Sequence, residues 1–290
     1  MAIEMVGIVG AGQMGRQITR IMSAAGLHVV LGDTNDEVLG EAVAEITDHL
    51  NAAVKQGKLT EWVKDKTLKN IRPTVRYEDF SHCDVIVEMV PEQEEIKAEV
   101  FEILDGICPD ETIFASGTSS LSITRLASMT DRPEQFLGLN FLHPETALVE
   151  VVRGWQTSDA TFDQAKGLVE KMGGIPMPCS DSPGFLVNRI VMPMINEAVF
   201  ALSESLAPPE LIDRAITIGA RHTLGPLALA DQIGLDVCLD VMEVLFTEFG
   251  DPKYRPAPLL RKYVEADMLG RKTGRGFYLY NEATPIRRGK

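Results

Sequence analysis

Apolar residues in the first half of the chain form short runs that alternate with helical patterns. Val6–Val9 and Leu27–Leu31 are apolar runs of strand length, with a helical pattern between them. A long helical pattern follows over Asp36–Asn70, broken at Gln56–Lys58. A strand that leads into a helix and then into another strand is the repeating unit of an open parallel sheet. The pattern therefore predicts an α/β domain with a doubly wound sheet.

The same alternation continues further along the chain. More apolar strands are predicted at Val85–Val90, Thr112–Ala115, Phe136–Phe141 and Val149–Val152. An amphipathic helix is predicted over Gln93–Asp105. These elements extend the predicted sheet well beyond the first unit of strand, helix and strand.

Strand patterns fade after a Pro-Gly pair at 183–184. Helical patterns take their place at Phe185–Ser205, Pro209–Gly219, Ala228–Gly250 and Pro258–Ala266. Because proline and glycine mark chain breaks, we place a domain boundary here. The prediction is a first domain at 1–182 and an all-helical second domain at 183–290.

Composition narrows the classes of partner. The chain has 290 residues, a formal net charge of −14, and four cysteines without CxxC spacing. An acidic surface repels nucleic acid and anionic membranes, so neither is expected as a partner. The cysteine spacing predicts neither a disulfide framework nor a metal site. Without a basic, apolar leader or a run of ~18 apolar residues, the protein is expected in the cytoplasm.

The first predicted strand runs into a glycine motif, Gly10-Ala11-Gly12-Gln13-Met14-Gly15, which opens a helix. Gly10 allows a tight turn, Gly12 lets a pyrophosphate approach the backbone, and Gly15 permits close packing of helix on strand. The start of the helix offers free amides to phosphates. Asp33 ends the second strand 18 positions after Gly15 (33 − 15), where a carboxylate binds ribose hydroxyls and repels a 2′-phosphate. The motif predicts a Rossmann-like domain that binds NAD through these residues, with Gln13 and Met14 at the turn.

Four further segments carry a family resemblance. They are Glu88–Glu92 with Lys97, Ser116–Leu121, Ser182–Arg189 and the Gly-rich tail Leu269–Tyr278. They resemble motifs of the 3-hydroxyacyl-CoA dehydrogenase family, most closely its bacterial 3-hydroxybutyryl-CoA type, and the resemblance extends over nearly the whole chain. The resemblance implies NAD-dependent hydride transfer in fatty acid metabolism, by a homodimer that the second domain builds.

The resemblance also implies roles for individual residues. Glu92 and Lys97 would contact the nicotinamide ribose side of NAD, while Ser119 and Asn188 would bind the substrate oxygen. The family motif reads Ser-Asn-Thr-Ser-Ser-Leu where this chain has Gly117 in the second place. Without the resemblance, these residues would be read as a solvated helix start and an ordinary polar loop.

The chain departs from the family at the expected catalytic base. The family reads His-Phe-Phe-Asn-Pro, whereas this chain has Asn140 in place of the His and His143 in place of the Asn. An amide does not titrate near neutral pH, so Asn140 can donate a hydrogen bond but cannot act as the base. The pairing glutamate maps to Glu150, 10 positions after Asn140 (150 − 140), where the family is expected to have 12. We predict that His143 is a relocated acid/base paired with Glu150; the alternative is a loop histidine bonded to backbone.

The sequence says less about the carrier to which the substrate's acyl group is attached. The family binds the CoA nucleotide with basic residues after the second strand, where this chain keeps Lys55 and Lys58. The leading hypothesis is an oxidoreductase that interconverts 3-hydroxyacyl and 3-oxoacyl thioesters with NAD. A first alternative keeps the chemistry but takes a carrier-protein-tethered hydroxyacyl group or a small hydroxy acid. A second is a catalytically silent NAD-binding homologue.

Overall fold

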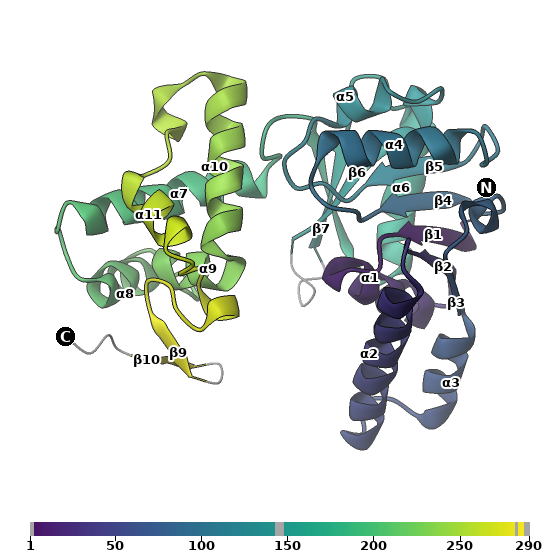
Figure 1. The fold of residues 1–290 in the computed structure, drawn as a ribbon, viewed down its shortest axis with the longest axis horizontal. Coiled ribbons are helices and arrows are strands. Elements are labelled where there is room, and N and C mark those ends of the chain that lie inside the picture. The colour runs from purple at the N-terminus through teal and green to yellow at the C-terminus, as the bar shows by residue number, and fades with distance from the viewer. Residues whose placement is uncertain (1–2, 143–147, 282–283, 287–290) are drawn as a thin grey trace. The chain divides into compact units, whose positions relative to one another are not determined.

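The computed structural model describes residues 3–142, 148–281 and 284–286. Two compact units divide the chain, Met1–Ser182 and Pro183–Lys290 (Figure 1). The first contains the large sheet, and the second is mainly helical. No helix in the described ranges is long and apolar enough to cross a membrane.

The first unit is built on an eight-stranded sheet in the order β3-β2-β1-β4-β5-β6-β7-β8. Its strands are β1 Met5–Val9, β2 His28–Gly32, β3 Ile71–Thr74, β4 Val85–Glu88, β5 Ile113–Ser116, β6 Phe136–Phe141, β7 Leu148–Arg153 and β8 Ile175–Ser180. All neighbours run parallel except β6 and β7, which are antiparallel. The order of the first six strands is that of a Rossmann domain, which confirms the predicted fold class.

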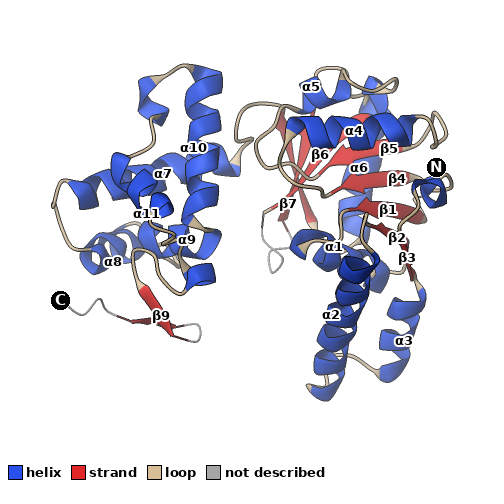
Figure 2. Ribbon diagram, in the orientation of Figure 1, coloured by secondary structure: helices blue, strands red, loops and turns tan. Residues whose placement is uncertain are grey.

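Helices flank this sheet (Figure 2). They are α1 Gln13–Ala24, α2 Asp36–Lys55, α3 Glu61–Lys69, α4 Glu94–Asp105, α5 Ile123–Ala127 and α6 Asp159–Lys171, with short 3₁₀ turns at Tyr77–Phe80 and Pro133–Gln135. Gly57 separates α2 from α3 with a φ of +71°, as the predicted break requires. Apolar side chains such as Ile18 on α1 and Leu39 on α2 pack with Ile8 and Leu31 of the sheet in a buried core.

The sequence patterns missed the two edge strands. β3 contains Pro73, and β8 contains Pro176 and Pro178. Proline cannot donate to a strand ladder, so it weakens a strand pattern, yet an edge strand tolerates it. β3 and β8 are the outermost strands of the sheet, where only one neighbour has to be satisfied.

The second unit contains five α-helices in the described part of the chain. They are α7 Val187–Ser203, α8 Pro209–Gly219, α9 Pro226–Ile233, α10 Leu235–Phe249 and α11 Pro258–Glu265, with 3₁₀ turns at Pro252–Tyr254 and Arg271–Thr273. The single helix predicted over Ala228–Gly250 was wrong, because Gly234 has a φ of +110° and separates α9 from α10. The unit also includes two short antiparallel strands, β9 Leu279–Asn281 and β10 Thr284–Ile286, that the all-helical prediction omitted.

Two buried aspartates tie the second unit together. Asp213 accepts hydrogen bonds from the amides of Leu227 (2.8 Å) and Ala228 (2.9 Å) and from the hydroxyl of Tyr278 (2.8 Å). Asp231 accepts the amides of Phe277 and Tyr278, each at 2.9 Å. Burial raises the pKa of Asp231, although these amide donors pull it down. The Gly-rich tail is therefore fastened to the helices by charged acceptors rather than by apolar packing alone.

Candidate functional site

The turn between β1 and α1 shows why each of its glycines is needed. Gly10 has a φ of +111°, and a Cβ atom there would lie 2.5 Å from the carbonyl oxygen of Met89. A Cβ atom on Gly15 would lie 1.9 Å from the carbonyl oxygen of Gly10. A Cβ atom on Gly12, by contrast, would meet no atom within 4 Å. The protein's own packing thus explains Gly10 and Gly15, whereas Gly12 keeps open space at the start of α1, where a phosphate would approach.

A cleft of about 670 Å³ opens beside this turn. Gly10, Gly12 and Asp33 all line it, and Asp33 accepts the Ala11 amide at 2.8 Å. The carboxylate is thereby held at the rim of the cleft while part of it remains accessible to a ribose. The residues fit the adenosine and pyrophosphate part of a dinucleotide. Gln13 is exposed at the start of α1, and Met14 packs partly against the core.

Two further residues of the cleft could not be predicted from the glycine motif. Arg76 and Tyr77, which follow β3, also line the cleft. Burial raises the pKa of the Tyr77 hydroxyl, and the nearby carboxylates of Glu99 and Asp33 add to the shift. Because β3 was not predicted, its following segment could not be placed at the cleft.

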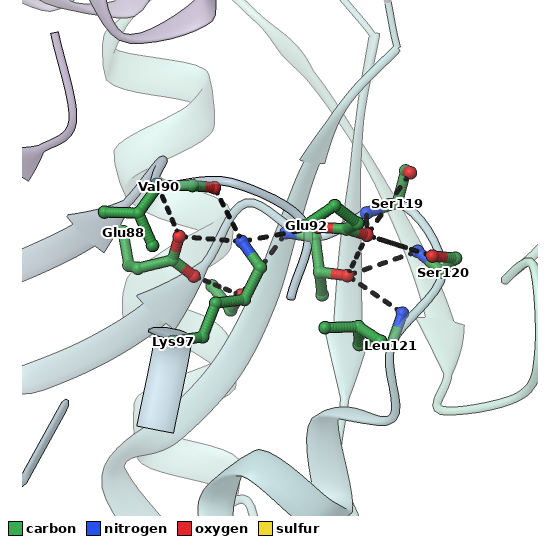
Figure 3. Close-up of polar contacts among 9 residues, drawn as sticks. Glu88, Val90, Glu92, Lys97, Ser119, Ser120 and Leu121 are labelled. Atoms are coloured by element: carbon green, nitrogen blue, oxygen red, sulfur yellow. Dashed lines mark hydrogen bonds and ion pairs between the residues drawn. The ribbon is translucent and has the colours of Figure 1, made fainter. Parts of the chain in front are cut away.

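A buried ion pair lies at the carboxyl end of β4 (Figure 3). Glu88 is fully buried, and one of its carboxylate oxygens accepts from Lys97 Nζ at 2.7 Å and from the Val90 amide at 2.7 Å. The other oxygen accepts from the Ser116 hydroxyl at 2.7 Å. Burial raises the pKa of Glu88, while Lys97 and these donors oppose the shift. One carboxylate thus joins the loop and the helix that follow β4 to the end of β5.

Lys97 directs its ammonium group at three acceptors. Besides Glu88, it donates to the Val90 carbonyl oxygen at 3.2 Å and lies 3.3 Å from Glu92 Oε2. An ammonium has three hydrogens, so these three contacts occupy all of them. The predicted contact of Lys97 with the nicotinamide ribose stays a prediction. Through these contacts Lys97 holds the segment from Glu88 to Glu92 in place.

Glu92 extends the network to the loop after β5. Its Oε1 accepts from the Thr118 hydroxyl at 2.5 Å, the Ser119 amide at 2.9 Å and the Ser120 amide at 3.2 Å (Figure 3). Burial alone would raise the pKa of Glu92, but Lys97 and these hydrogen bonds outweigh it and lower the pKa. The carboxylate predicted to serve the cofactor and the serine predicted to serve the substrate therefore touch each other.

Sequence reasoning assigned no role to Glu88, Ser116 or Thr118. One signal was present, since Glu88 is a charged residue that ends an apolar strand, and such a residue is rarely buried without a partner. Its partner, Lys97, lies nine positions later on a helix, a separation that no local pattern connects.

The residues at the expected base position lie on adjacent antiparallel strands. Asn140 on β6 is directly opposite Glu150 on β7, and Asn140 Nδ2 donates to Glu150 Oε2 at 2.7 Å. Both side chains are buried, with exposures of 3% and 0%. Asn140 is therefore placed as a donor to a buried carboxylate, and it supplies no titratable proton there.

The remaining predicted residues are spread over the chain. His143 lies outside the described residues, so its pairing with Glu150 stays a prediction. Asn188 is buried near the start of α7 in the second unit. Lys55 ends α2, and Lys58 follows in the turn before α3; both are exposed. Across the described residues, no group of three or more His, Cys, Asp or Glu side chains is placed to hold a metal ion.

Comparisons with known proteins agree with this geometry. The family of 3-hydroxyacyl-CoA dehydrogenase NAD binding domains matches residues 5–182, and that of the C-terminal domains matches residues 184–280. The chain belongs to the 3-hydroxyacyl-CoA dehydrogenase family. It is accordingly an NAD-dependent oxidoreductase, as the glycine turn and Asp33 indicate.

Similar proteins cover nearly the whole length of the chain. A 3-hydroxybutyryl-CoA dehydrogenase of Bradyrhizobium diazoefficiens is 47% identical over 98% of both chains. A probable 3-hydroxybutyryl-CoA dehydrogenase of Bacillus subtilis is 44% identical over 98% of this chain and all of its own. The crystal structure of the (S)-3-hydroxybutyryl-CoA dehydrogenase PaaH1 from Ralstonia eutropha superposes with a TM-score of 0.93 at 47% identity, covering 97% of this chain and 100% of that one.

Proposed function

We propose that this protein interconverts a short-chain 3-hydroxyacyl-CoA and its 3-oxoacyl-CoA. Three similar proteins in the comparisons carry names of 3-hydroxybutyryl-CoA dehydrogenases, which supports a four-carbon acyl group. Lys55 and Lys58 are the proposed contacts for the CoA phosphates, because both are exposed cations beside the first unit's α2–α3 turn.

One observation carries this proposal: Glu92 binds the loop of Ser119. The cofactor cleft includes Val90 and Pro91, and the next residue, Glu92, accepts the Ser119 amide at 2.9 Å. A protein that only bound NAD would have no need to tie its cofactor segment to a serine-rich loop. A dehydrogenase needs that link, since hydride transfer requires the substrate carbon and the cofactor to meet in a fixed geometry.

The chemistry of each side chain suggests its proposed role in the reaction. The bound cofactor supplies the hydride acceptor. Ser119 and Asn188 are proposed to bind the substrate oxygen. Asn140 keeps Glu150 oriented through its 2.7 Å hydrogen bond. His143, three residues after Asn140 in the sequence, is proposed to take the hydroxyl proton in oxidation and to return it in reduction, since imidazole titrates near neutral pH.

The test is NADH oxidation with acetoacetyl-CoA by the wild type, His143→Ala and Asn140→His. The wild type is expected to turn over, and His143→Ala to lose about 100-fold or more in kcat. His222→Ala is the matched control, because His222 is an exposed histidine of the second unit. A wild type that is inactive beside an active Asn140→His would overturn the proposed reaction. An active wild type with an unimpaired His143→Ala would keep the reaction and remove His143 from it.

A second measurement identifies the carrier of the acyl group. Free CoA is expected to compete with acetoacetyl-CoA, and Lys55→Ala with Lys58→Ala is expected to raise KM more than it lowers kcat, because both residues bind the carrier rather than the reacting atoms. Inhibition by pantetheine but not by CoA would favour a carrier protein as the source of the acyl group.

We also propose a cytoplasmic homodimer formed by the second unit. Leu211 and Ile218 of α8 are seven residues apart, on one face of the helix, and are 54% and 65% exposed; Leu206 is 77% exposed. Apolar surface of this kind favours association with another copy. Light scattering of the purified protein should give the mass of two chains, and Ile218→Glu should give the mass of one.

A further inference from the structure

We propose that Met89 and Gly117 act as one unit that shapes the NAD cleft at the carboxyl end of β4. The Met89 thioether supplies an apolar wall there, and the missing side chain at position 117 leaves the room that the thioether occupies. Met89 is then a cofactor-binding residue, and Gly117 is the residue that positions it. The sequence departs from its family motif at Gly117, and the structure supplies a reason.

The two residues lie on the correct side of the sheet for this role. Met89 directly follows β4, and Gly117 directly follows β5. Asp33, which marks the adenosine half, follows β2 on the other side of β1. In a doubly wound sheet the dinucleotide crosses the point where the strand order reverses, here between β1 and β4, so it passes the carboxyl end of β4.

The contact between the residues is direct. A Cβ atom built on Gly117 would lie 2.4 Å from both Sδ and Cε of Met89, well inside the ordinary contact distance of ~4 Å. The thioether therefore lies where any side chain at position 117 would begin. The same Cβ atom would be 2.9 Å from the Glu88 carbonyl oxygen, a smaller overlap that does not involve Met89.

The Met89 backbone is held close to the turn after β1. The Met89 amide donates to the Val9 carbonyl oxygen at 2.7 Å, and its carbonyl oxygen crowds the position of a Cβ on Gly10. Met89 also lines the cleft together with Val90 and Pro91. A side chain at 117 would thus displace the thioether, and that displacement changes the surface of the cleft.

Four proteins test the unit: the wild type, Met89→Ala, Gly117→Ala and the double variant. NADH affinity is measured by fluorescence titration without substrate, so the result does not depend on the proposed reaction. Met89→Ala is expected to weaken NADH binding roughly ten-fold, from the loss of one to two buried methylene equivalents. Gly117→Ala is expected to weaken it at least as much, and the double variant to bind like Met89→Ala alone, because no thioether remains to be displaced.

Matched variants separate a role at the cofactor from a role in folding. Met172→Ala removes the same atoms from a methionine that packs against the same core but does not line the cleft, and it should leave NADH affinity unchanged. Met89→Leu should keep the affinity, while Met89→Gln, of similar length but polar, should lose it. Without NADH, Met89→Leu and Met89→Gln should unfold at similar midpoints. Their NADH affinities should nevertheless differ.

Two results would overturn the proposal. If Gly117→Ala weakened NADH binding by the same factor with and without Met89, the glycine would act through the Glu88 backbone alone. If Met89→Gln bound NADH like the wild type, the thioether would not be a wall of the cofactor cleft.

Discussion

Replacing Lys97 with Met gives the sharpest test of the buried network. Met has nearly the shape of Lys without the charge, so the change removes a cation and leaves little cavity. In the native protein Lys97 Nζ lies 2.7 Å from Glu88 Oε1, and the two side chains are 1% and 0% exposed. The variant leaves the Glu88 carboxylate buried with only the Val90 amide and the Ser116 hydroxyl as donors.

The size of the effect follows from that burial. Removing one partner of a buried ion pair costs roughly 3–5 kcal/mol, since the remaining charge has no compensating partner and no water. The second partner of Lys97 adds little, because Glu92 is 38% exposed and solvent screens its charge. The first unit of Lys97→Met is therefore expected to be less stable by about 3–5 kcal/mol at neutral pH.

The loss should depend on pH in a definite direction. Burial raises the pKa of Glu88 above its ordinary value, and Lys97 is the largest influence that opposes the shift. A carboxyl whose pKa is higher in the folded state stabilises the fold fully below its unfolded pKa, and this contribution is lost as the pH rises through the folded pKa. Without Lys97 the folded pKa of Glu88 rises further. Lys97→Met should be least destabilised at acidic pH, where Glu88 is neutral, and most destabilised above neutrality.

Urea unfolding followed by circular dichroism at pH 5.5, 7 and 8.5 would measure this. The double variant Glu88→Gln with Lys97→Met serves as the control, because it removes both charges and should recover much of the loss at pH 8.5. Equal destabilisation of the single variant at all three pH values, with no recovery in the double variant, would refute the assignment of Glu88 and Lys97 as a buried charge pair.

Three further predictions concern the cofactor cleft and the second unit. Gly12→Ala should weaken NADH binding at least ten-fold, measured by fluorescence titration, with little loss of stability. Gly15→Ala should unfold at a markedly lower urea concentration, because its Cβ atom would lie 1.9 Å from a backbone oxygen. Asp33→Ala should bind NADH about ten-fold less tightly and discriminate less against NADPH, and unchanged discrimination would remove the carboxylate from the ribose site. Tyr278→Phe leaves Asp213 with its two amide donors, so it should cost about 1–2 kcal/mol in urea unfolding without changing NADH affinity.

The sequence predicted the parts of the fold that local patterns encode. The strands around Ile8, Leu31 and Val87 are continuous apolar runs because helices cover both faces of the sheet. The glycine turn was readable because backbone geometry and ligand access restrict its residues to glycine. The prolines of β3 and β8 weakened the strand pattern at the edges, where strand pairing alone determines the structure.

Only part of the candidate site could be predicted, because several of its residues meet only in the folded chain. Asp33 could be placed because it ends a strand at a fixed distance from the glycine turn. Glu88 and Lys97 are brought together by the packing of α4 beside β4, and Glu92 reaches Thr118 across two strand ends. Such contacts depend on the tertiary arrangement of segments that no local period connects. The space that Met89 fills at Gly117 is likewise visible only in three dimensions.

The ladder between β6 and β7 also bears on how such a protein can diverge. Asn140 and Glu150 face each other because their strands are hydrogen-bonded in that register, up to the pair Phe141 and Val149. A change in the number of residues between Phe141 and Leu148 alters the connection without altering which side chains are opposed. Insertions and deletions in this interval can therefore accumulate under selection for a new substrate while the buried carboxylate keeps its place.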